Sequence, residues 1–228
     1  MKTYETVIHE HPELQGSSRY CNICGYRFSR FLPFGVKPRE AKCPVCGSLE
    51  RHRHIYIHIA SLYPFLNSKR VLHFAPEPIL KEIFLKSGAE YFDVDINPQK
   101  ATHKIDIQNI SFSSSMFDYI FCIHVLEHIP DDRKAMTELY RVLKPGGIAY
   151  LCVPLKKLFH EDLTITDPME RTRLYGQHDH VRNYDFETFR NRLSDAGFNT
   201  DIVSYPTSFP AGLADACLGD IFFLARKL

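Results

Sequence analysis

Four of the seven cysteines stand in two close pairs near the start of the chain. The first pair is Cys21 and Cys24, the second is Cys43 and Cys46, and a glycine follows each pair. Two thiolates three positions apart can hold one metal ion from a tight turn that the glycine tolerates, and two such turns complete a tetrahedron. The pattern predicts a zinc ion. Because four sulfurs leave no position open for water or substrate, we expect this ion to be structural.

Histidines form a second group of side chains with a chemical use near neutral pH. The segment 175–182 combines two imidazoles with a carboxylate, an amide and a guanidinium, in a stretch without regular periodicity. Loops of this composition are usually functional, so His180 and His178 are candidate general bases. We favour His180 because it lies closer to the start of the next predicted helix. The alternatives are a solvated surface loop, or a metal site built from His178, Asp179 and His180.

Length and composition limit the possible classes of protein. A chain of 228 residues suffices for one α/β domain and a small appendage. The net charge of +1 does not favour a nucleic-acid partner. The first residues lack the apolar core of a signal peptide, and no run of about 18 apolar residues occurs. These features predict a cytoplasmic protein that does not enter a membrane.

The character of the sequence changes near residue 50. We expect a zinc ribbon over residues 1–50, a connecting helix over 51–68 and the main domain over 69–228. In the main domain apolar runs alternate with amphipathic stretches, which favours a parallel sheet covered by helices. The strands are expected at residues 70–75, 91–96, 117–123, 148–153, 201–205 and 221–225, with helices at 77–87, from about 130 to 143, and after Asp185.

Three segments of the main domain follow one another in a distinctive order. Val94-Asp95-Ile96 is followed by FDYIFCIHVLEHIPD, which begins at Phe117, and then by LKPGG, which begins at Leu143. In this order and spacing, the stretch 69–154 resembles the class I S-adenosylmethionine-dependent methyltransferases, specifically their small-molecule and ubiquinone-biosynthesis-like branch. The resemblance implies a Rossmann-like α/β fold with a seven-stranded, mostly parallel sheet and helices on both faces.

The resemblance also implies which residues hold S-adenosylmethionine. Asp95 matches the acid that accepts hydrogen bonds from the ribose hydroxyls, a role that also suits an acid at the end of a strand in a nucleotide-binding fold. Asp106 matches the acid that receives the adenine amino group. The alternative for both acids is that they only cap strands and turns. The remaining residues implied at the cofactor are Ile96, Ile107, Ile123 and His124.

The first motif departs from the family, which usually has an acid and a glycine-rich turn there. Ala75 occupies the position of the first glycine, and its Cβ limits the backbone angles and the approach of a ligand. We hypothesise that Glu77 replaces the missing acid and meets the ammonium group of the cofactor. The alternative is that Glu77 is a helix-start carboxylate favoured by the helix dipole.

These residues predict an enzyme that transfers a methyl group to a small-molecule or sugar-linked acceptor, with oxygen the preferred atom. His180, His124 and His178 are the candidate bases, whereas His128 is expected to pack. The insertion 155–184 is expected to build the acceptor pocket. Aromatic residues expected to line it are Phe159, Tyr175 and Tyr184. Arginines that either grip an anionic group of the acceptor or are solvated are Arg171, Arg173 and Arg182.

Two other functions fit parts of the sequence. The ribbon is locally basic and rich in aromatic residues, so the chain could be an RNA methyltransferase that docks RNA through it, unless those aromatics form the ribbon's own core. The lost glycine-rich turn is compatible with a non-catalytic binding protein. The sequence does not identify the acceptor or the oligomeric state.

Overall fold

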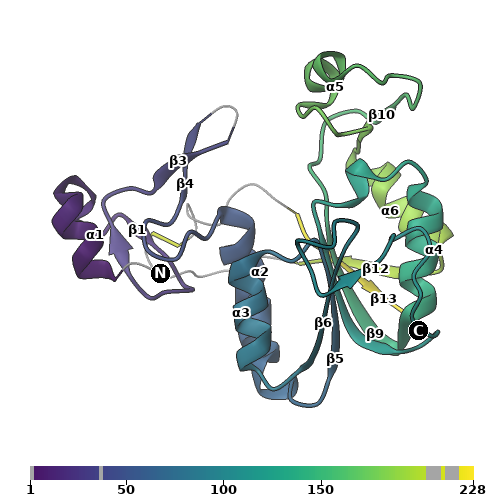
Figure 1. Cartoon of the computed structure of the whole chain (residues 1–228), viewed down its shortest axis with the longest axis horizontal. Helices are drawn as coiled ribbons and strands as arrows, with labels where there is room; N and C mark the ends of the chain where they lie inside the picture. Colours follow the sequence, from purple (N-terminus) through teal and green to yellow (C-terminus); the bar gives the residue numbers. More distant parts are fainter. Residues whose placement is uncertain (1–2, 36–37, 204–211, 214–220) are drawn as a thin grey trace. The chain divides into compact units, whose positions relative to one another are not determined.

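The computed structural model of the chain describes residues 3–35, 38–203, 212–213 and 221–228. These residues divide into two compact units, which are described separately (Figure 1). The first is built on Met1–Phe65 and Pro78–Ile83 and includes Gly212 and Leu213, and the second is built on Leu66–Glu77, Phe84–Val203 and Ile221–Leu228. Within the described residues, no helix has both the length and the apolar character needed to cross a membrane.

The first unit consists of short elements around the cysteine pairs. The cysteines of the first pair lie in the turn between strands β1 and β2, and those of the second pair follow strand β4. The strands pair antiparallel, β1 with β2 and β3 with β4. The elements are α1 (Tyr4–Glu10), η1 (Pro12–Leu14), β1 (Arg19–Tyr20), β2 (Arg27–Phe28), β3 (Leu32–Phe34), β4 (Arg39–Lys42), α2 (Glu50–Leu62) and η2 (Tyr63–Phe65).

Two residues from late in the chain complete the core of this unit. Leu213 is 4% exposed and packs with Val7 and Phe28, and the amide of Tyr20 donates a hydrogen bond to the carbonyl of Gly212 at 3.1 Å. Gly212 has a φ of +80°, and a Cβ there would lie 2.6 Å from the Ser18 carbonyl oxygen. The sequence predicted that residues 212–213 belong to the main domain, whereas in the structure they pack with the ribbon.

The second unit contains a seven-stranded sheet in the order β12-β13-β9-β8-β5-β6-β7, which confirms the predicted sheet. All neighbouring strands from β9 to β7 pair in parallel, and β13 runs antiparallel to both β9 and β12. The strands are β5 (Arg70–Phe74), β6 (Glu90–Asp95), β7 (His103–Lys104), β8 (Phe117–Ile123), β9 (Leu143–Cys152), β12 (Asn199–Ile202) and β13 (Phe223–Arg226). Residues 204 and 205, which the sequence placed in the strand seen as β12, lie outside the described residues.

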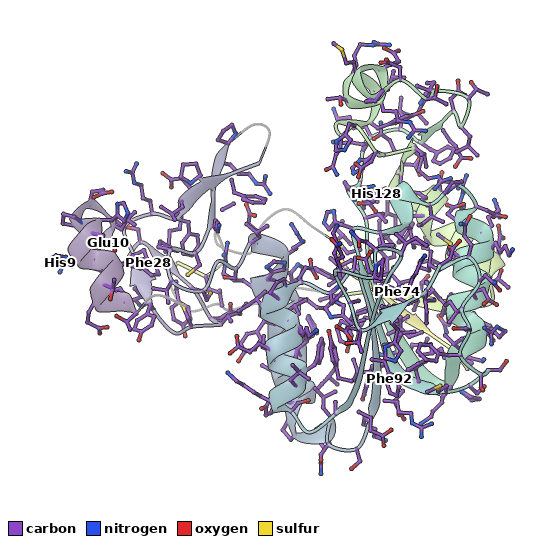
Figure 2. All side chains as sticks on the ribbon, in the orientation of Figure 1. His9, Glu10, Phe28, Phe74, Phe92 and His128 are labelled. Carbon is purple, nitrogen blue, oxygen red and sulfur yellow. The ribbon has the colours of Figure 1, made fainter. Side chains whose placement is uncertain are left out.

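Helices α4 (Asp132–Val142) and α6 (Phe186–Asp195) lie side by side against one face of this sheet (Figure 1). Each begins at an aspartate side chain that accepts a backbone hydrogen bond: Asp131 from Lys134 N, and Asp185 from Thr188 N at 2.7 Å, as predicted for α6. Their apolar faces pack on Phe74 and its neighbours, which Figure 2 shows in the sheet. The helix after β5 is α3 (Pro78–Lys86), and the turn after β8 contains η3 (Leu126–His128).

The insertion 155–184 is more regular than the sequence indicated. It contains the two-stranded pair β10 (His160–Glu161) and β11 (Arg182–Asn183), and helix α5 (Pro168–Tyr175). Helix α5 begins at Asp167, which caps Glu170 N, and ends at Gly176 with a φ of +89°. The prediction of an irregular stretch is therefore wrong for α5, whose polar composition hid the helix.

A buried ionic cluster fastens this insertion to the sheet domain. Arg182 has no exposed side-chain surface, and it donates hydrogen bonds to Glu161 and to the backbone carbonyls of Leu126 and Pro130. Tyr184 is also fully buried and bonds to Asp132. Arg182 is thus neither solvated nor available to a substrate, and Tyr184 does not line a pocket, which corrects both predictions. Their partners lie 20 to 60 residues away in sequence, so local patterns carried no signal.

Candidate functional site

Two residues with left-handed backbone angles stand at the carboxyl ends of the central strands. Ala75 follows β5 with a φ of +46°, and His124 follows β8 with a φ of +54°. Both conformations are held by the neighbouring strands, because Ala75 N donates to Val94 O and His124 N donates to Cys152 O, each at 2.9 Å. Non-glycine residues rarely adopt such angles, and they gather at functional sites. The turn after β5 thus has the left-handed backbone angle that glycine usually supplies, although Ala75 occupies that position.

The strand order reverses between β5 and β8, so these two ends border the crevice where open α/β sheets bind ligands. A cavity of about 590 Å³ lies there. It is walled by the ends of β5, β6 and β8, by residues 105–108 after β7, and by residues from the η3 turn and the 177–179 segment. Six of the residues predicted at the cofactor line it: Ala75, Asp95, Ile96, Asp106, Ile107 and His124.

The two predicted acids are held in defined positions on this wall. Asp95 ends β6, and its Oδ1 accepts a hydrogen bond from Asn97 N at 2.7 Å. The Oδ1 of Asp106 accepts from Gln108 N at 2.8 Å, and the Gln108 amide also reaches both carboxylate oxygens. Both acids therefore cap their own turns, as the alternative interpretation held, and both also face the cavity. The two roles are compatible, since a carboxylate can accept several hydrogen bonds.

The cavity does not include every predicted cofactor residue. Ile123 is 2% exposed within β8 and is not among the lining residues. Glu77 is not among them either, and its Oε2 lies 3.5 Å from Nε2 of His73, a histidine with no exposed side-chain surface. The proposed contact of Glu77 with the cofactor ammonium stays a prediction, and its observed partner is His73.

The three candidate bases have different surroundings. His124 lines the cavity, and its Nδ1 lies 3.3 Å from Oε1 of Glu127. His178 is exposed. His180 is 7% exposed, and its Nδ1 donates to the carbonyl of Tyr175 at 3.3 Å. Burial lowers the pKa of His180, which favours the neutral imidazole. Of the three, His124 is therefore the one placed to meet a ligand in the cavity.

Several lining residues were not predicted from the sequence. Gln177 and Asp179 enter from the insertion, Lys100 from the turn after β6, and His128 from η3 (labelled in Figure 2). His128 Nδ1 lies 3.3 Å from Asp179 Oδ2. His128 was expected to pack; its ring stands against that of His180 and is partly exposed on the cavity wall.

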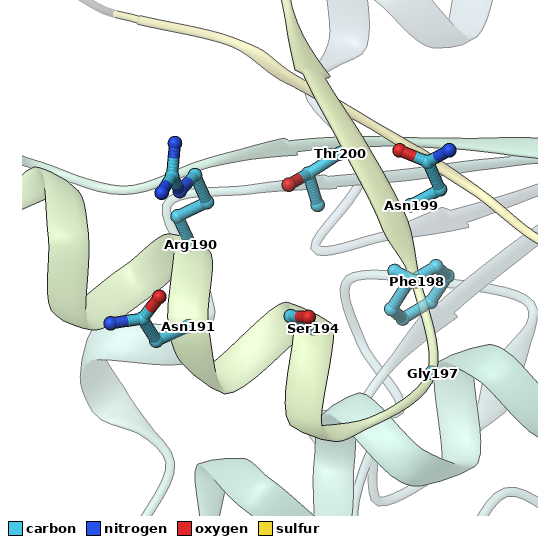
Figure 3. Close-up of a pocket in the computed structure, with 7 residues that line it drawn as sticks. All are labelled: Arg190, Asn191, Ser194, Gly197, Phe198, Asn199 and Thr200. Carbon is cyan, nitrogen blue, oxygen red and sulfur yellow. The ribbon is translucent and has the colours of Figure 1, made fainter.

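A second hollow, of about 480 Å³, lies between α6 and β12 (Figure 3). It is lined by Arg190, Asn191, Ser194, Gly197, Phe198, Asn199 and Thr200. Asn199 begins β12, so this hollow lies at the amino edge of the sheet, opposite the strand ends that carry Ala75 and His124. Ligands of open α/β sheets bind at the carboxyl edge, so the larger cavity is the candidate site.

The four cysteines of the first unit come together as the spacing predicted. Their Sγ atoms lie within 4.8 Å of one another, with 3.6 Å between Cys21 and Cys46 and 3.7 Å between Cys24 and Cys43. The two glycines adopt the left-handed angles that the turns require, with φ of +78° and +73°. Hydrogen bonds from the Cys24 and Cys43 thiols lower the pKa of Cys21 far below its ordinary value.

A buried arginine of α2 supports this cysteine cluster. The side-chain oxygen of Ser48 lies 3.3 Å from Cys21 Sγ and 3.2 Å from Cys46 Sγ. Arg53, with no exposed surface, donates to the backbone carbonyl of Ser48 at 2.6 Å and to that of Ala41 at 2.8 Å, and stands 4.3 Å from the ring centre of Phe31. The guanidinium brings a positive charge close to a cluster of potential thiolates.

Comparison with known proteins agrees with this geometry. Residues 64–203, more than half of the chain, match the family described as "Methyltransferase domain". A demethylmenaquinone methyltransferase of Staphylococcus epidermidis is 29% identical over 131 residues, which are 50% of this chain and 52% of that protein. The chain spans about half the length, or less, of the curated relatives it matches.

Solved structures share the fold at low sequence identity. An S-adenosylmethionine-dependent methyltransferase from Archaeoglobus fulgidus superposes with a TM-score of 0.55 at 16% identity, covering 79% of this chain and 95% of that chain. A 1,6-didemethyltoxoflavin-N1-methyltransferase from Burkholderia thailandensis, with bound S-adenosylhomocysteine, gives 0.54 at 16% identity, covering 78% of each chain. The chain therefore belongs to the family described as "Methyltransferase domain", and its seven-stranded sheet has the Rossmann-like α/β fold of these structures.

Proposed function

We propose that the chain methylates a hydroxyl oxygen of a small-molecule or sugar-linked acceptor. The observation that carries the proposal is the composition of the cavity, which has two acids after β6 and β7 and a second polar wall formed by His124, His128, Gln177 and Asp179. The acids suit the ribose and the adenine of S-adenosylmethionine, as the family resemblance implies. The second wall then remains for the acceptor.

In this proposal His124 is the base. The acceptor oxygen attacks the methyl carbon of the sulfonium, the S–C bond breaks, the O–C bond forms, and the hydroxyl proton passes to the imidazole. The carboxylate of Glu127, 3.3 Å from His124 Nδ1, stabilises the protonated ring. A positioned base of this kind contributes about 10²–10⁴-fold to the rate.

The test uses S-adenosylmethionine with a ¹³C-labelled methyl group and a panel of hydroxylated metabolites and nucleotide sugars. NMR of the product identifies the atom that receives the label. His124→Ala should slow turnover about 10²–10⁴-fold, a larger effect than its effect on cofactor affinity, because the base acts mainly in the transition state. His9→Ala, an exposed histidine of α1, is the matched control and should behave as the wild type. Transfer of the label to nitrogen or sulfur would overturn the assignment to oxygen.

We also infer that the four cysteines hold a structural zinc ion. A tetrahedron with Zn–S bonds of about 2.3 Å has edges of about 3.8 Å, close to the 3.6 and 3.7 Å separations of the sulfurs. The Ser48 hydroxyl would support the sulfurs, as groups around metal ligands commonly do. Metal analysis of the purified protein should find a zinc ion per chain that a chelator removes with partial unfolding of the first unit.

RNA methylation is the second candidate, and the ribbon's exposed aromatics are the observation in its favour. Tyr26 is 38% exposed and Phe34 43%, whereas Phe28 and Phe31 are buried in the unit's own core. Stacking on RNA would therefore rely on the first two. Steeply salt-dependent binding to RNA, lost in a Tyr26→Ala/Phe34→Ala variant, would favour this candidate, and no binding at low salt would remove it.

A further inference from the structure

A cluster of three metal-ligating side chains stands beside the acceptor wall of the cavity. Glu127 and His128 come from η3, and His180 comes from the segment just before β11. One ligand atom from each of the three lies within 4.8 Å of the others. The backbone ties the two segments together, because Val181 N donates to Glu127 O at 3.0 Å. The sequence had grouped His180 with His178 and Asp179, whereas in the structure it meets Glu127 and His128.

Glu127 is a buried carboxylate whose side-chain oxygens accept no hydrogen bond within the described part of the chain. The residue is 1% exposed. The nearest ring nitrogen of His124 lies 3.3 Å from Oε1, outside hydrogen-bond geometry. Buried carboxylates in proteins are usually paired with a cationic side chain or bound to a metal ion. A protonated His124 is one cation beside this carboxylate, and an ion at the cluster would supply a second.

The two histidines are held as metal ligands usually are. Nδ1 of His128 faces the carboxylate of Asp179 at 3.3 Å, and Nδ1 of His180 faces the carbonyl of Tyr175 at 3.3 Å. A ring that donates through Nδ1 keeps the lone pair of Nε2 for a ligand bond, and a carboxylate or a carbonyl is the usual partner of the other nitrogen. The rings stand nearly perpendicular, at 84° with 4.7 Å between their centres.

We propose that Glu127, His128 and His180 bind one divalent transition-metal ion, such as Mn²⁺, Fe²⁺ or Zn²⁺, at the wall of the acceptor cavity. Two imidazoles and one carboxylate suit these ions better than Mg²⁺ or Ca²⁺, which prefer oxygen ligands. Three protein ligands leave positions open, as in catalytic metal sites. His128 is the one of these three residues that lines the cavity, so the proposed ion would meet the acceptor on the His128 side of the cluster.

The role of the ion rests on the proposed O-methylation. An acceptor hydroxyl that binds the metal loses its proton more readily, and the proton passes to His124 or to solvent. With the ion beside it, the acceptor oxygen would attack the methyl carbon; the C–O bond would form, the S–C bond would break, and the metal would keep its oxidation state. An acceptor with a second oxygen beside the first would use two of the open positions.

The binding test uses the full-length protein with the cysteine cluster already loaded with zinc. Mn²⁺ is the probe because a four-thiolate site selects softer ions. Electron paramagnetic resonance follows the loss of the free Mn²⁺ signal, and we expect one saturable Mn²⁺ per chain. Glu127→Gln and His180→Ala should weaken binding by more than tenfold, and His9→Ala should bind as the wild type. A wild-type protein that takes up neither Mn²⁺ nor a second equivalent of zinc would overturn the proposal.

Asp179→Asn is the variant to use if a substitution at the buried positions fails to fold. Asp179 is exposed and orients His128, so its loss should weaken Mn²⁺ binding about 10–100-fold with the fold intact. Calorimetric titration of S-adenosylmethionine into the same samples separates the two proposals. A protein that binds the cofactor but no metal would refute only the metal-site proposal. A protein that binds the metal but no cofactor would refute only the proposed methylation. Unchanged Mn²⁺ affinity in all three variants would also refute the proposed metal site.

Discussion

Replacement of Asp95 by alanine should weaken S-adenosylmethionine binding about 10- to 140-fold. The carboxylate ends β6 on the cavity wall, and the bond from Asn97 N to its Oδ1 at 2.7 Å holds it in place, which leaves Oδ2 for a ribose hydroxyl. A hydrogen bond to a charged group is worth about 1.5–3 kcal/mol. Since about 1.4 kcal/mol is tenfold in affinity, this range gives the predicted loss.

Isothermal titration calorimetry of the cofactor measures this effect directly. Asp95→Asn keeps an oxygen for the turn at Asn97 but removes the charge, so its loss of affinity should be smaller than that of the alanine variant. Asp201→Ala is the control, because its side chain on β12 is 70% exposed and lies away from the cavity lining. Circular dichroism should show that all variants are folded. Alanine and wild-type proteins with the same affinity would refute the placement of the ribose.

The remaining predictions concern the ribbon, the strained turn and the ionic cluster. Cys21→Ser/Cys24→Ser should release zinc, measured by metal analysis, and keep cofactor binding, measured by calorimetry; loss of both would make the ribbon integral to the sheet domain. Ala75→Gly should raise the free energy of unfolding in urea by up to about 1.6 kcal/mol, because relief of the left-handed angle contributes about 1–2 kcal/mol and the greater freedom of glycine in the unfolded chain removes about 0.4–1 kcal/mol. A less stable variant would contradict this. Arg182→Met should cost about 3–5 kcal/mol in the same assay by leaving buried acids unpaired, whereas Arg173→Met, whose side chain is 68% exposed, should leave the midpoint unchanged. Burial alone would raise the pKa of Glu161, but the hydrogen bonds from Arg192 and Arg182 lower it overall. The contribution of Glu161 to the free energy of unfolding should therefore be complete above its ordinary pKa and lost as the pH falls through the lowered value. In unfolding experiments from pH 7 to pH 3, Glu161→Gln should make the free energy of unfolding depend less steeply on pH.

Local patterns in the sequence predicted the elements whose causes are local. The strand predicted at residues 117–123 has the same bounds as β8. It could be predicted because a continuous apolar run is a property of the local sequence alone. The cap at Asp185 was also predicted, because it depends on residues three positions apart. The cofactor wall followed from the resemblance, and the cavity contains six of its predicted residues.

The features that the sequence did not reveal depend on distant pairs. Glu127 and His180 meet across 53 positions of sequence, so the "LEH" stretch indicated packing, and the loop at 175–182 indicated a separate site. The prediction for Arg182 was wrong for the same reason, because the sequence alone does not show whether an arginine side chain is buried or solvated. Helix α5 was hidden by its polar composition, since its caps at Asp167 and Gly176 were present in the sequence but not accompanied by an apolar stripe.

The contact of Gly212 and Leu213 with the ribbon has a consequence for the order of folding. During synthesis both cysteine pairs leave the ribosome early, so the proposed zinc ion would have all four of its ligands by residue 46. The apolar core around Phe28, however, is completed by a leucine that is made nearly 170 residues after Cys46. Contacts so far apart in sequence form slowly. One side of the first unit's core would therefore stay open until Leu213 is made, and a fragment cut after residue 50 would keep that apolar surface exposed.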